Sequence, residues 1–237
     1  MKTNIHRSAD RGHTQTDWLN SKHSFSFGNY HDSKKMGFGL LRVLNDDEIT
    51  AGSGFPTHAH NDMEIISIPL SGSLAHQDSE GNHSTINVGD VQIMSAGTGI
   101  EHSEFNASKT EPGQFLQIWI APQKLHLKPS YAQKTFDSSD FYNQFATIVS
   151  PNRKRGSLLI NQEAWLCLGH LVQFFNLDYF IRQRNNGAFL FVIEGSAEVN
   201  GEEISRRDAI EISETSKFNV TALSPNTQIL IIEVPLK

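Results

Sequence analysis

Two short stretches of the sequence share one spacing of side chains that can bind metals. The stretch THAHNDMEI places His58 and His60 two positions apart, and GTGIEHSEFN places His102 and Glu104 two positions apart. On a β-strand, side chains at i and i+2 point to the same face. Two neighbouring strands would therefore direct three imidazoles and one carboxylate to a single point.

Such a ligand set suits a single transition-metal ion. Imidazoles with one carboxylate suit Fe(II), Mn(II), Ni(II), Cu(II) or Zn(II). Four protein ligands around an octahedral ion leave two positions for a substrate or dioxygen, whereas structural metal sites are usually closed. One His-x-His pair is weak evidence, because eleven histidines give about half a pair by chance. The two pairs together predict a metal site.

The elements that must position these pairs are β-strands. Short apolar or alternating runs, separated by turn residues, cover residues 37–44, 63–79, 84–97, 113–122, 188–204, 208–213, 217–223 and 228–236. This spacing is typical of sandwiches and barrels rather than of a parallel α/β sheet. Asn200-Gly201 and Gly81-Asn82 are hairpin signals. The polar segment 130–145 is interpreted as a connection.

A weak internal repeat indicates two domains of one kind. Residues 68–73 (IPLSGS) resemble 192–196 (VIEGS), and a hairpin followed by an Asp-led strand comes after each, at Asp90 and Asp208. We therefore predict two β-barrel domains, joined near residues 145–156.

The predicted domains are residues 1–148 and 149–237. His170 is the one histidine beyond residue 126. The metal site is accordingly expected in the first domain, and the second is expected to be structural or to form a wall for the first.

Composition excludes several classes of protein. A chain of 237 residues can form one large or two small domains, and its net charge of −6 argues against direct nucleic-acid binding. There is no apolar signal core and no apolar run of about 18 residues, so no membrane partner is expected. Cys167 is the one cysteine, which excludes an internal disulfide, fits a reducing cytoplasm and is interpreted as a small buried apolar residue.

Two segments resemble the motifs of the cupin superfamily. The first contains Gly52, His58, His60, Glu64 and Gly72, and the second contains Gly89, Gly97, His102 and Asn106.

Three departures separate these segments from the general cupin pattern. Ser95 replaces a proline, four residues rather than two separate Gly97 from His102, and seven rather than six precede Gly72 after Glu64. Glu64 would be the fourth ligand of a general cupin. A shift of one residue turns that side chain to the other face of its strand unless a bulge absorbs it.

The departures fit the pirin branch of the cupins. The sequence resembles pirins over residues 10–125, and more loosely after residue 150. The quoted stretches are RGHTQTDWLNSKHSFSFGNYHD, MGFGLLRVLNDD, HAHNDMEIISIPLSGSLAHQDSEGN, VQIMSAGTGIEHSEFN and LQIWIAP. The resemblance implies an all-β bicupin of two jelly-roll barrels, with one iron-type site in the amino-terminal barrel. Its ligands would be His58, His60, His102 and Glu104, which leaves Glu64 as a neighbour of the ligands.

The resemblance also implies quercetin 2,3-dioxygenase activity, in which dioxygen opens the ring of a flavonol and carbon monoxide is released. Fe(II) is the first choice of metal, with Mn, Ni, Cu, Co or Zn as alternatives. Glu104 is expected to act as general base on the 3-hydroxyl group. An aromatic substrate needs apolar walls, for which Phe55, Met63 and Phe105 are candidates, together with Phe25, Phe27 and Phe38.

The other histidines of the amino-terminal half are not expected to be ligands. We interpret His23 and His31 as structural hydrogen-bonding residues, because neither has a histidine or carboxylate at i+2. His76 and His83 flank a predicted hairpin and are expected to be exposed.

Two other functions stay open at this point. One is a metal-binding regulatory protein that binds a protein partner according to the redox state of its metal. The other is a different enzyme, such as an isomerase or another oxygenase, on the same site. A deep closed pocket would favour an enzyme, whereas an apolar or basic surface around the metal opening would favour a binding protein. Physiological substrate, native metal and oligomeric state are not fixed by the sequence.

Overall fold

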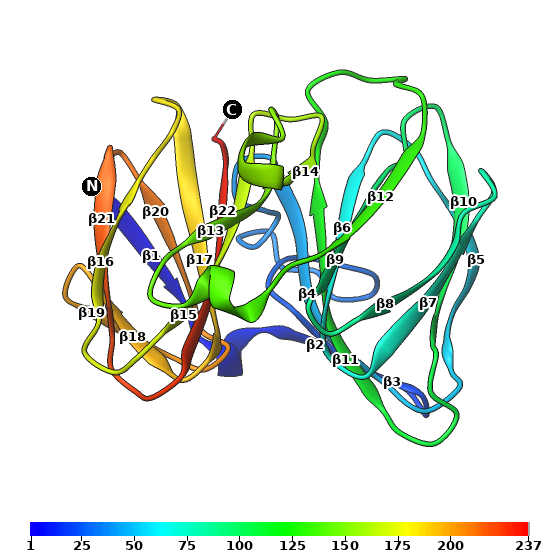
Figure 1. The fold of residues 1–237 in the computed structure, drawn as a ribbon, viewed down its shortest axis with the longest axis horizontal. Coiled ribbons are helices and arrows are strands. Elements are labelled where there is room, and N and C mark those ends of the chain that lie inside the picture. The colour runs from blue at the N-terminus through cyan, green and yellow to red at the C-terminus, as the bar shows by residue number, and fades with distance from the viewer. Residues whose placement is uncertain (237) are drawn as a thin grey trace.

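The computed structural model describes residues 1–236 and shows two lobes of β-strands side by side (Figure 1). In this range there is no α-helix, and therefore none that could cross a membrane. Three short 3-10 helices are present: η1 (Ser8–Asp10), η2 (Ser138–Phe141) and η3 (Lys154–Gly156). The predicted all-β class is confirmed.

The amino-terminal half contains two facing sheets. The larger has the order β12-β9-β6-β11-β4-β3-β2 and the smaller the order β5-β10-β7-β8. The larger consists of β2 (Gly12–Gln15), β3 (Leu19–His23), β4 (Leu41–Ile49), β6 (Glu64–Ser71), β9 (Asp90–Ser95), β11 (Gly113–Ile120) and β12 (Ser130–Thr135). The smaller consists of β5 (Gly54–His60), β7 (Ser73–Asp78), β8 (His83–Asn87) and β10 (Ile100–Asn106).

The carboxy-terminal half repeats this arrangement, with the orders β1-β20-β17-β22-β15-β13-β14 and β16-β21-β18-β19. Its larger sheet consists of β1 (Lys2–His6), β13 (Ala146–Ser150), β14 (Leu158–Leu159), β15 (Trp165–Leu171), β17 (Asn186–Glu194), β20 (Ala209–Ser213) and β22 (Thr227–Pro235). Its smaller sheet consists of β16 (Asn176–Phe180), β18 (Ser196–Val199), β19 (Glu202–Ser205) and β21 (Lys217–Ala222). Each half is a pair of separate sheets, and no barrel closed by hydrogen bonds forms in the described part of the chain.

The internal repeat corresponds to a repeated unit of four strands. In each copy, a strand of the larger sheet is followed by a hairpin in the smaller sheet and by a return strand: β6-β7-β8-β9 and β17-β18-β19-β20. Asn200 and Gly201 form the two-residue turn between β18 and β19, both with positive φ, as their sequence predicts.

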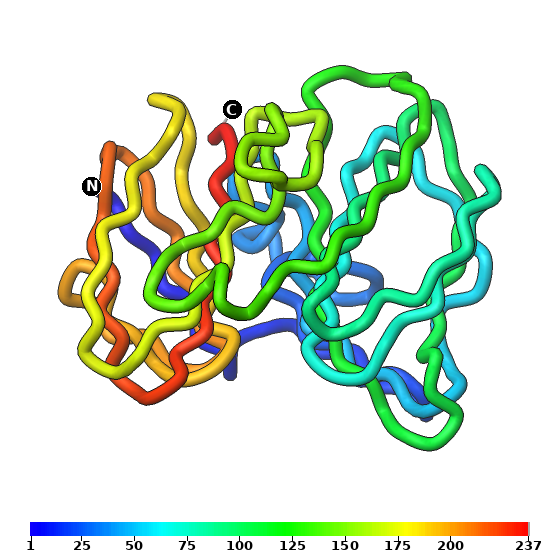
Figure 2. The backbone as a smooth tube through the Cα atoms, in the orientation of Figure 1, coloured from blue at the N-terminus to red at the C-terminus, as the bar shows by residue number. Residues whose placement is uncertain are grey.

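Two expectations about connections need correction. The chain begins in the carboxy-terminal half, because β1 pairs with β20 over its whole length; the first and last strands share one lobe (Figure 2). The sheet that contains the last strand of the chain thus also contains residues 2–6. The predicted division into residues 1–148 and 149–237 had assigned residues 2–6 to the first domain. The segment interpreted as a connection contains β12, which pairs with β9 in register from Ser130 to Thr135.

The two larger sheets enclose a shared apolar core between the lobes. Leu44 of β4, Ile66 of β6 and Ile118 of β11 pack there with Phe189 and Ile232 of the other half. Because side chains alternate along a strand, the neighbours of the first three point to the opposite face, into the amino-terminal lobe. The core between the lobes thereby fixes the back wall of the candidate site.

Candidate metal centre

Strands β5 and β10 are neighbours and bring the two sequence motifs together. His58 lies directly opposite His102 in the register, and His60 follows two residues along β5. The ring centroids are 4.8 Å apart for His58–His60, 4.5 Å for His58–His102 and 4.9 Å for His60–His102. One nitrogen from each ring lies within 4.8 Å of the other two. The structure thus brings the three predicted histidines to one point.

The hydrogen bonds around these rings suit a cation. His58 Nδ1 donates to the carbonyl of Pro56 (2.8 Å), which leaves the Nε2 lone pair pointing inward. His58 Nε2 lies 3.1 Å from His102 Nε2. His60 Nε2 is buried and has no partner among residues 1–236. A metal ion is the group that would satisfy several such lone pairs at once.

Two of the three histidines, His60 and His102, are held neutral. Burial lowers the pKa of His60 to about 4, helped by the neighbouring His58. Burial, together with the neighbouring His58, His60 and His76, lowers the pKa of His102 to about 3. Since only a neutral imidazole has a free lone pair, both rings are in the metal-binding form at neutral pH.

Glu104 is buried beside this group. A shift in register between His102 and Glu104 marks a bulge in the pairing with β5. Ser67 Oγ donates to Oε1 (2.9 Å) and Gln117 Nε2 to Oε2 (2.7 Å), while burial raises the pKa of the carboxyl group. Glu104 groups within 4.8 Å with His102 and His76, and not with His58 and His60. The fourth predicted ligand is therefore adjacent to the three histidines through His102.

The expectation that His76 is exposed is wrong. It is buried on β7, directly opposite Glu104 in the register, and stacks on Tyr131 at 4.8 Å. Its Nε2 donates to Asp78 (3.1 Å). The signal in the sequence was His76-x-Asp78, which repeats the i, i+2 spacing of the other two pairs. His83, as expected, is exposed.

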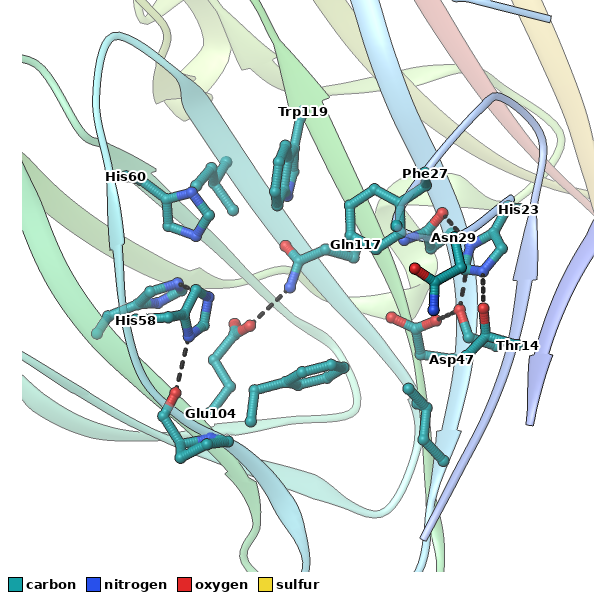
Figure 3. Close-up of a pocket in the computed structure, with 18 of the residues that line it drawn as sticks. Thr14, His23, Phe27, Asn29, Asp47, His58, His60, Glu104, Gln117 and Trp119 are labelled. Atoms are coloured by element: carbon teal, nitrogen blue, oxygen red, sulfur yellow. Dashed lines mark hydrogen bonds between the residues drawn. The ribbon is translucent and has the colours of Figure 1, made fainter. Parts of the chain in front are cut away.

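The histidines form one end of a cavity of about 430 Å³ (Figure 3). Its apolar walls include Trp119, which lies edge-on to His60 at 4.8 Å, and Phe27, which lies edge-on to Trp119 at 5.4 Å. The opposite end is polar, with Thr14, His23 and Asp47 in Figure 3. Ser21 and Asn45 also line the cavity and are hydrogen-bonded to Asp47 and His23, respectively. A planar aromatic molecule with polar groups at both ends suits such a space.

The predicted wall residues have different outcomes. Phe55 lines the cavity, as expected, and so does Phe27. Met63 packs against the apolar cluster beneath the wall without lining the cavity. Phe105 is 37% exposed and points outward, because it alternates with His102 and Glu104 along β10.

Glu64 likewise does not lie next to the ligands. It shares a strand face with Ile66, towards the other half, and accepts hydrogen bonds from Ser95 Oγ (2.8 Å) and the Asn161 backbone N–H (3.1 Å). Alternation along β6 directs this glutamate away from the cavity, and the pairing of β6 with β11 shifts register between Pro69 and Ser71.

His23 is buried and hydrogen-bonded to Thr14 and Asn45, in keeping with its structural interpretation, although it also lines the cavity. His31 is exposed. Sequence reasoning missed Asp47, Gln117 and Trp119, because no pair of potential ligands marks their strands and their inward face is known only from the packing.

The carboxy-terminal half holds no comparable site. Among the described residues, both groups of side chains that could hold a metal lie in the amino-terminal lobe.

The family models match nearly the whole chain. Residues 5–120 match Pirin, and residues 147–234 match the quercetinase C-terminal cupin domain. A quercetin 2,3-dioxygenase of Escherichia coli (strain K12) is 38% identical, with 98% of each chain covered. The chain belongs to the pirin family. A pirin-like protein of Caulobacter vibrioides is 36% identical over 90% of this chain and 92% of its own.

A solved pirin structure has the same fold. The bacterial pirin YhhW of Escherichia coli, in complex with nickel(II), superimposes with a TM-score of 0.93 at 37% identity, with 99% of each chain covered. The predicted family is thus confirmed, and the cupin-like fold of this pirin agrees with that of a solved relative.

Proposed function

We propose that this pirin is a metal-dependent dioxygenase that opens the ring of a flavonol, as in quercetin 2,3-dioxygenases. The observation that carries the proposal is the meeting of His58, His60 and His102 at the end of a largely apolar cavity. The name of the Escherichia coli relative and the nickel complex of YhhW support it.

His58, His60 and His102 would hold one divalent metal ion, with Glu104 as the fourth ligand. Fe(II) remains our first choice, with Mn, Ni, Cu, Co or Zn as alternatives, because a set of imidazoles and a carboxylate accepts all of them. A bound metal would supply a Lewis-acid position for the substrate oxygen and a means of passing electrons to dioxygen.

The protein's own contribution is to position the substrate and move its proton. Trp119, Phe27 and Phe55 would hold the flavonol between apolar surfaces and exclude water. We assign Glu104 as the general base that takes the proton of the 3-hydroxyl group. Burial raises its pKa, which makes the carboxylate a better proton acceptor, while Ser67 and Gln117 orient it.

The regulatory alternative has less support. The histidines face a cavity inside the lobe, which is the feature expected of an enzyme.

The buried, free Cys167 is in keeping with a proposed place in the reducing cytoplasm.

The test is turnover of quercetin under air after anaerobic reconstitution with each candidate metal separately. We expect loss of the flavonol's visible absorbance and release of carbon monoxide with at least one metal. Glu104→Gln with metal still bound should lower kcat by about 100-fold or more, because it removes the base. Bound metal without turnover in every sample would overturn the dioxygenase assignment, and full turnover in Glu104→Gln would remove the base role.

A further inference from the structure

The polar end of the cavity contains a buried carboxylate that is almost without partners. Asp47 of β4 is 2% exposed, and its one hydrogen bond within residues 1–236 is accepted by Oδ1 from Ser21 Oγ. No basic side chain of the described residues forms an ion pair with it. Burial raises its pKa to about 7. Proteins rarely leave such a group unsatisfied without a reason.

Glu233 of the other lobe shows how this fold satisfies a buried carboxylate when its role is structural. Glu233 accepts hydrogen bonds from Tyr179 Oη (3.0 Å), Arg182 Nη1 (3.2 Å) and Asn186 Nδ2 (3.1 Å). The guanidinium of Arg182 also supplies the opposite charge. Asp47 has no such cation and a single donor, Ser21, and it lines a cavity instead.

Asn45 lies two residues before Asp47 and faces the same cavity. Its Oδ1 accepts from His23 Nδ1 (2.9 Å), and His23 Nε2 in turn pairs with Thr14 Oγ1 (2.9 Å). These hydrogen bonds fix the side-chain amide of Asn45 so that its oxygen is used. Its Nδ2 has no hydrogen-bond partner in the described structure. The polar end therefore offers one free donor beside one free acceptor, on one strand.

A pair of neighbouring hydroxyl groups is complementary to this arrangement, since each hydroxyl can both donate and accept. We propose that Asp47 and Asn45 bind the hydroxyl groups of the substrate ring farthest from the metal centre, and so select aromatic substrates with vicinal hydroxyls on that ring. Figure 3 shows Asp47 on the opposite side of the pocket from His58 and His60, with Glu104 and Gln117 between them. The inference rests on the proposed function and names the substrate feature that the same cavity recognises.

The experiment compares two ligands and three proteins. The ligands are quercetin, which carries two neighbouring hydroxyls on its pendant ring, and the matched flavonol with no hydroxyl on that ring. The proteins are the wild type, Asp47→Asn, and Glu48→Gln as the control. Glu48 is the next residue on β4 but faces the other way, where it accepts a hydrogen bond from Gln114 (2.8 Å).

The dissociation constant of each ligand is measured anaerobically on the metal-loaded proteins by quenching of tryptophan fluorescence, since Trp119 lines the cavity. KM is measured on the metal-loaded proteins. For Asp47→Asn we expect about tenfold to hundredfold weaker binding of quercetin, with a matching rise in KM, as for loss of a hydrogen bond to a charged group. The unsubstituted flavonol should bind within about twofold of wild type, and Glu48→Gln should bind both ligands as wild type does.

The outcomes separate this inference from the proposed function. Equal effects of Asp47→Asn on both ligands, or none on either, would overturn the hydroxyl site even if quercetin is turned over. Asp47-dependent binding without turnover by any metal form would support the hydroxyl site and overturn the dioxygenase function. Absence of binding by the wild-type protein would overturn both. Thermal unfolding of each variant identifies a misfolded protein, and Asp47→Glu, which keeps the acceptor, should restore part of the preference.

Discussion

The two halves of the molecule share a strand pattern but enclose opposite kinds of interior. In the carboxy-terminal half, the space between the sheets is filled by aliphatic side chains such as Leu190, Ile210 and Val220, all fully buried. In the amino-terminal half, the corresponding space holds histidines and carboxyl groups around a cavity. One topology thus serves as a packed core in one lobe and as a site in the other.

The difference indicates where stability and function reside. Burial of aliphatic side chains contributes about 25 cal/mol per Å², so the filled lobe and the core between the lobes supply most of the hydrophobic stabilisation. The amino-terminal lobe has only small apolar clusters on either side of its cavity. The polar residues of its larger sheet, such as Asn45, Asp47 and Gln117, keep their positions because alternate residues of β4 and β11 are anchored in the core between the lobes.

The largest expected effect is loss of the metal from the amino-terminal lobe. His58→Ala removes one of three converging imidazoles, so metal content should fall from about one ion per chain to a small fraction of that, and turnover by at least about 100-fold. Metal content is measured by mass spectrometry of the metal and turnover with quercetin. His83→Ala is the matched control, because this exposed histidine lies on β8 outside both groups. Full metal content in His58→Ala would refute the assigned ligand set.

The second prediction concerns removal of Glu233, the hydrogen-bonded buried carboxylate of the carboxy-terminal lobe. Glu233→Ala leaves Tyr179, Arg182 and Asn186 without their acceptor, and we expect it to lower the free energy of unfolding by about 3–5 kcal/mol. Urea-induced unfolding measures the change. Metal content at low temperature should stay near that of wild type, because Glu233 lies in the lobe without the site. A change below about 1 kcal/mol would mean that this network does little for stability.

Much of this contrast was visible in the sequence. The i, i+2 spacing on strands correctly predicted the meeting of His58, His60 and His102, because alternation is a local property of a strand. The repeat and the shortage of histidines after residue 126 predicted two similar halves with the site in one.

What was missed depends on contacts between distant segments. Asp47 and Trp119 come from strands of the opposing sheet, and nothing near them in the sequence marks their inward face. Glu64 and Phe105 were placed near the site by type and proximity, but alternation along their strands turns them away. The pairing of β1 with β20 joins residues about 200 positions apart, and local pattern carries no information about it.

The smallest predicted effect concerns Asp47 and is opposite in sign to that of Glu233→Ala. It therefore sharpens the comparison between these two buried carboxylates. Burial raises the pKa of Asp47 from an ordinary 3.8 to about 7, so its contribution to stability is present below pH 4 and is lost as pH rises towards 7. A shift of this size sets an upper limit of about 4 kcal/mol on the loss. Asp47→Asn removes the titration but leaves an amide with unsatisfied hydrogen-bonding groups, so the net gain should be about 1–2 kcal/mol at pH 8.

The difference in free energy of unfolding between Asp47→Asn and wild type, measured with urea at pH 5 and pH 8, isolates this group from the histidines that titrate in both proteins. We expect the variant to gain on wild type as pH rises. Glu48→Gln, on the same strand, is the control, because its carboxyl group lies outside the cavity and accepts a hydrogen bond from Gln114. A difference that does not change with pH would mean that Asp47 is ionised at little cost, and that the two lobes treat their buried carboxylates alike.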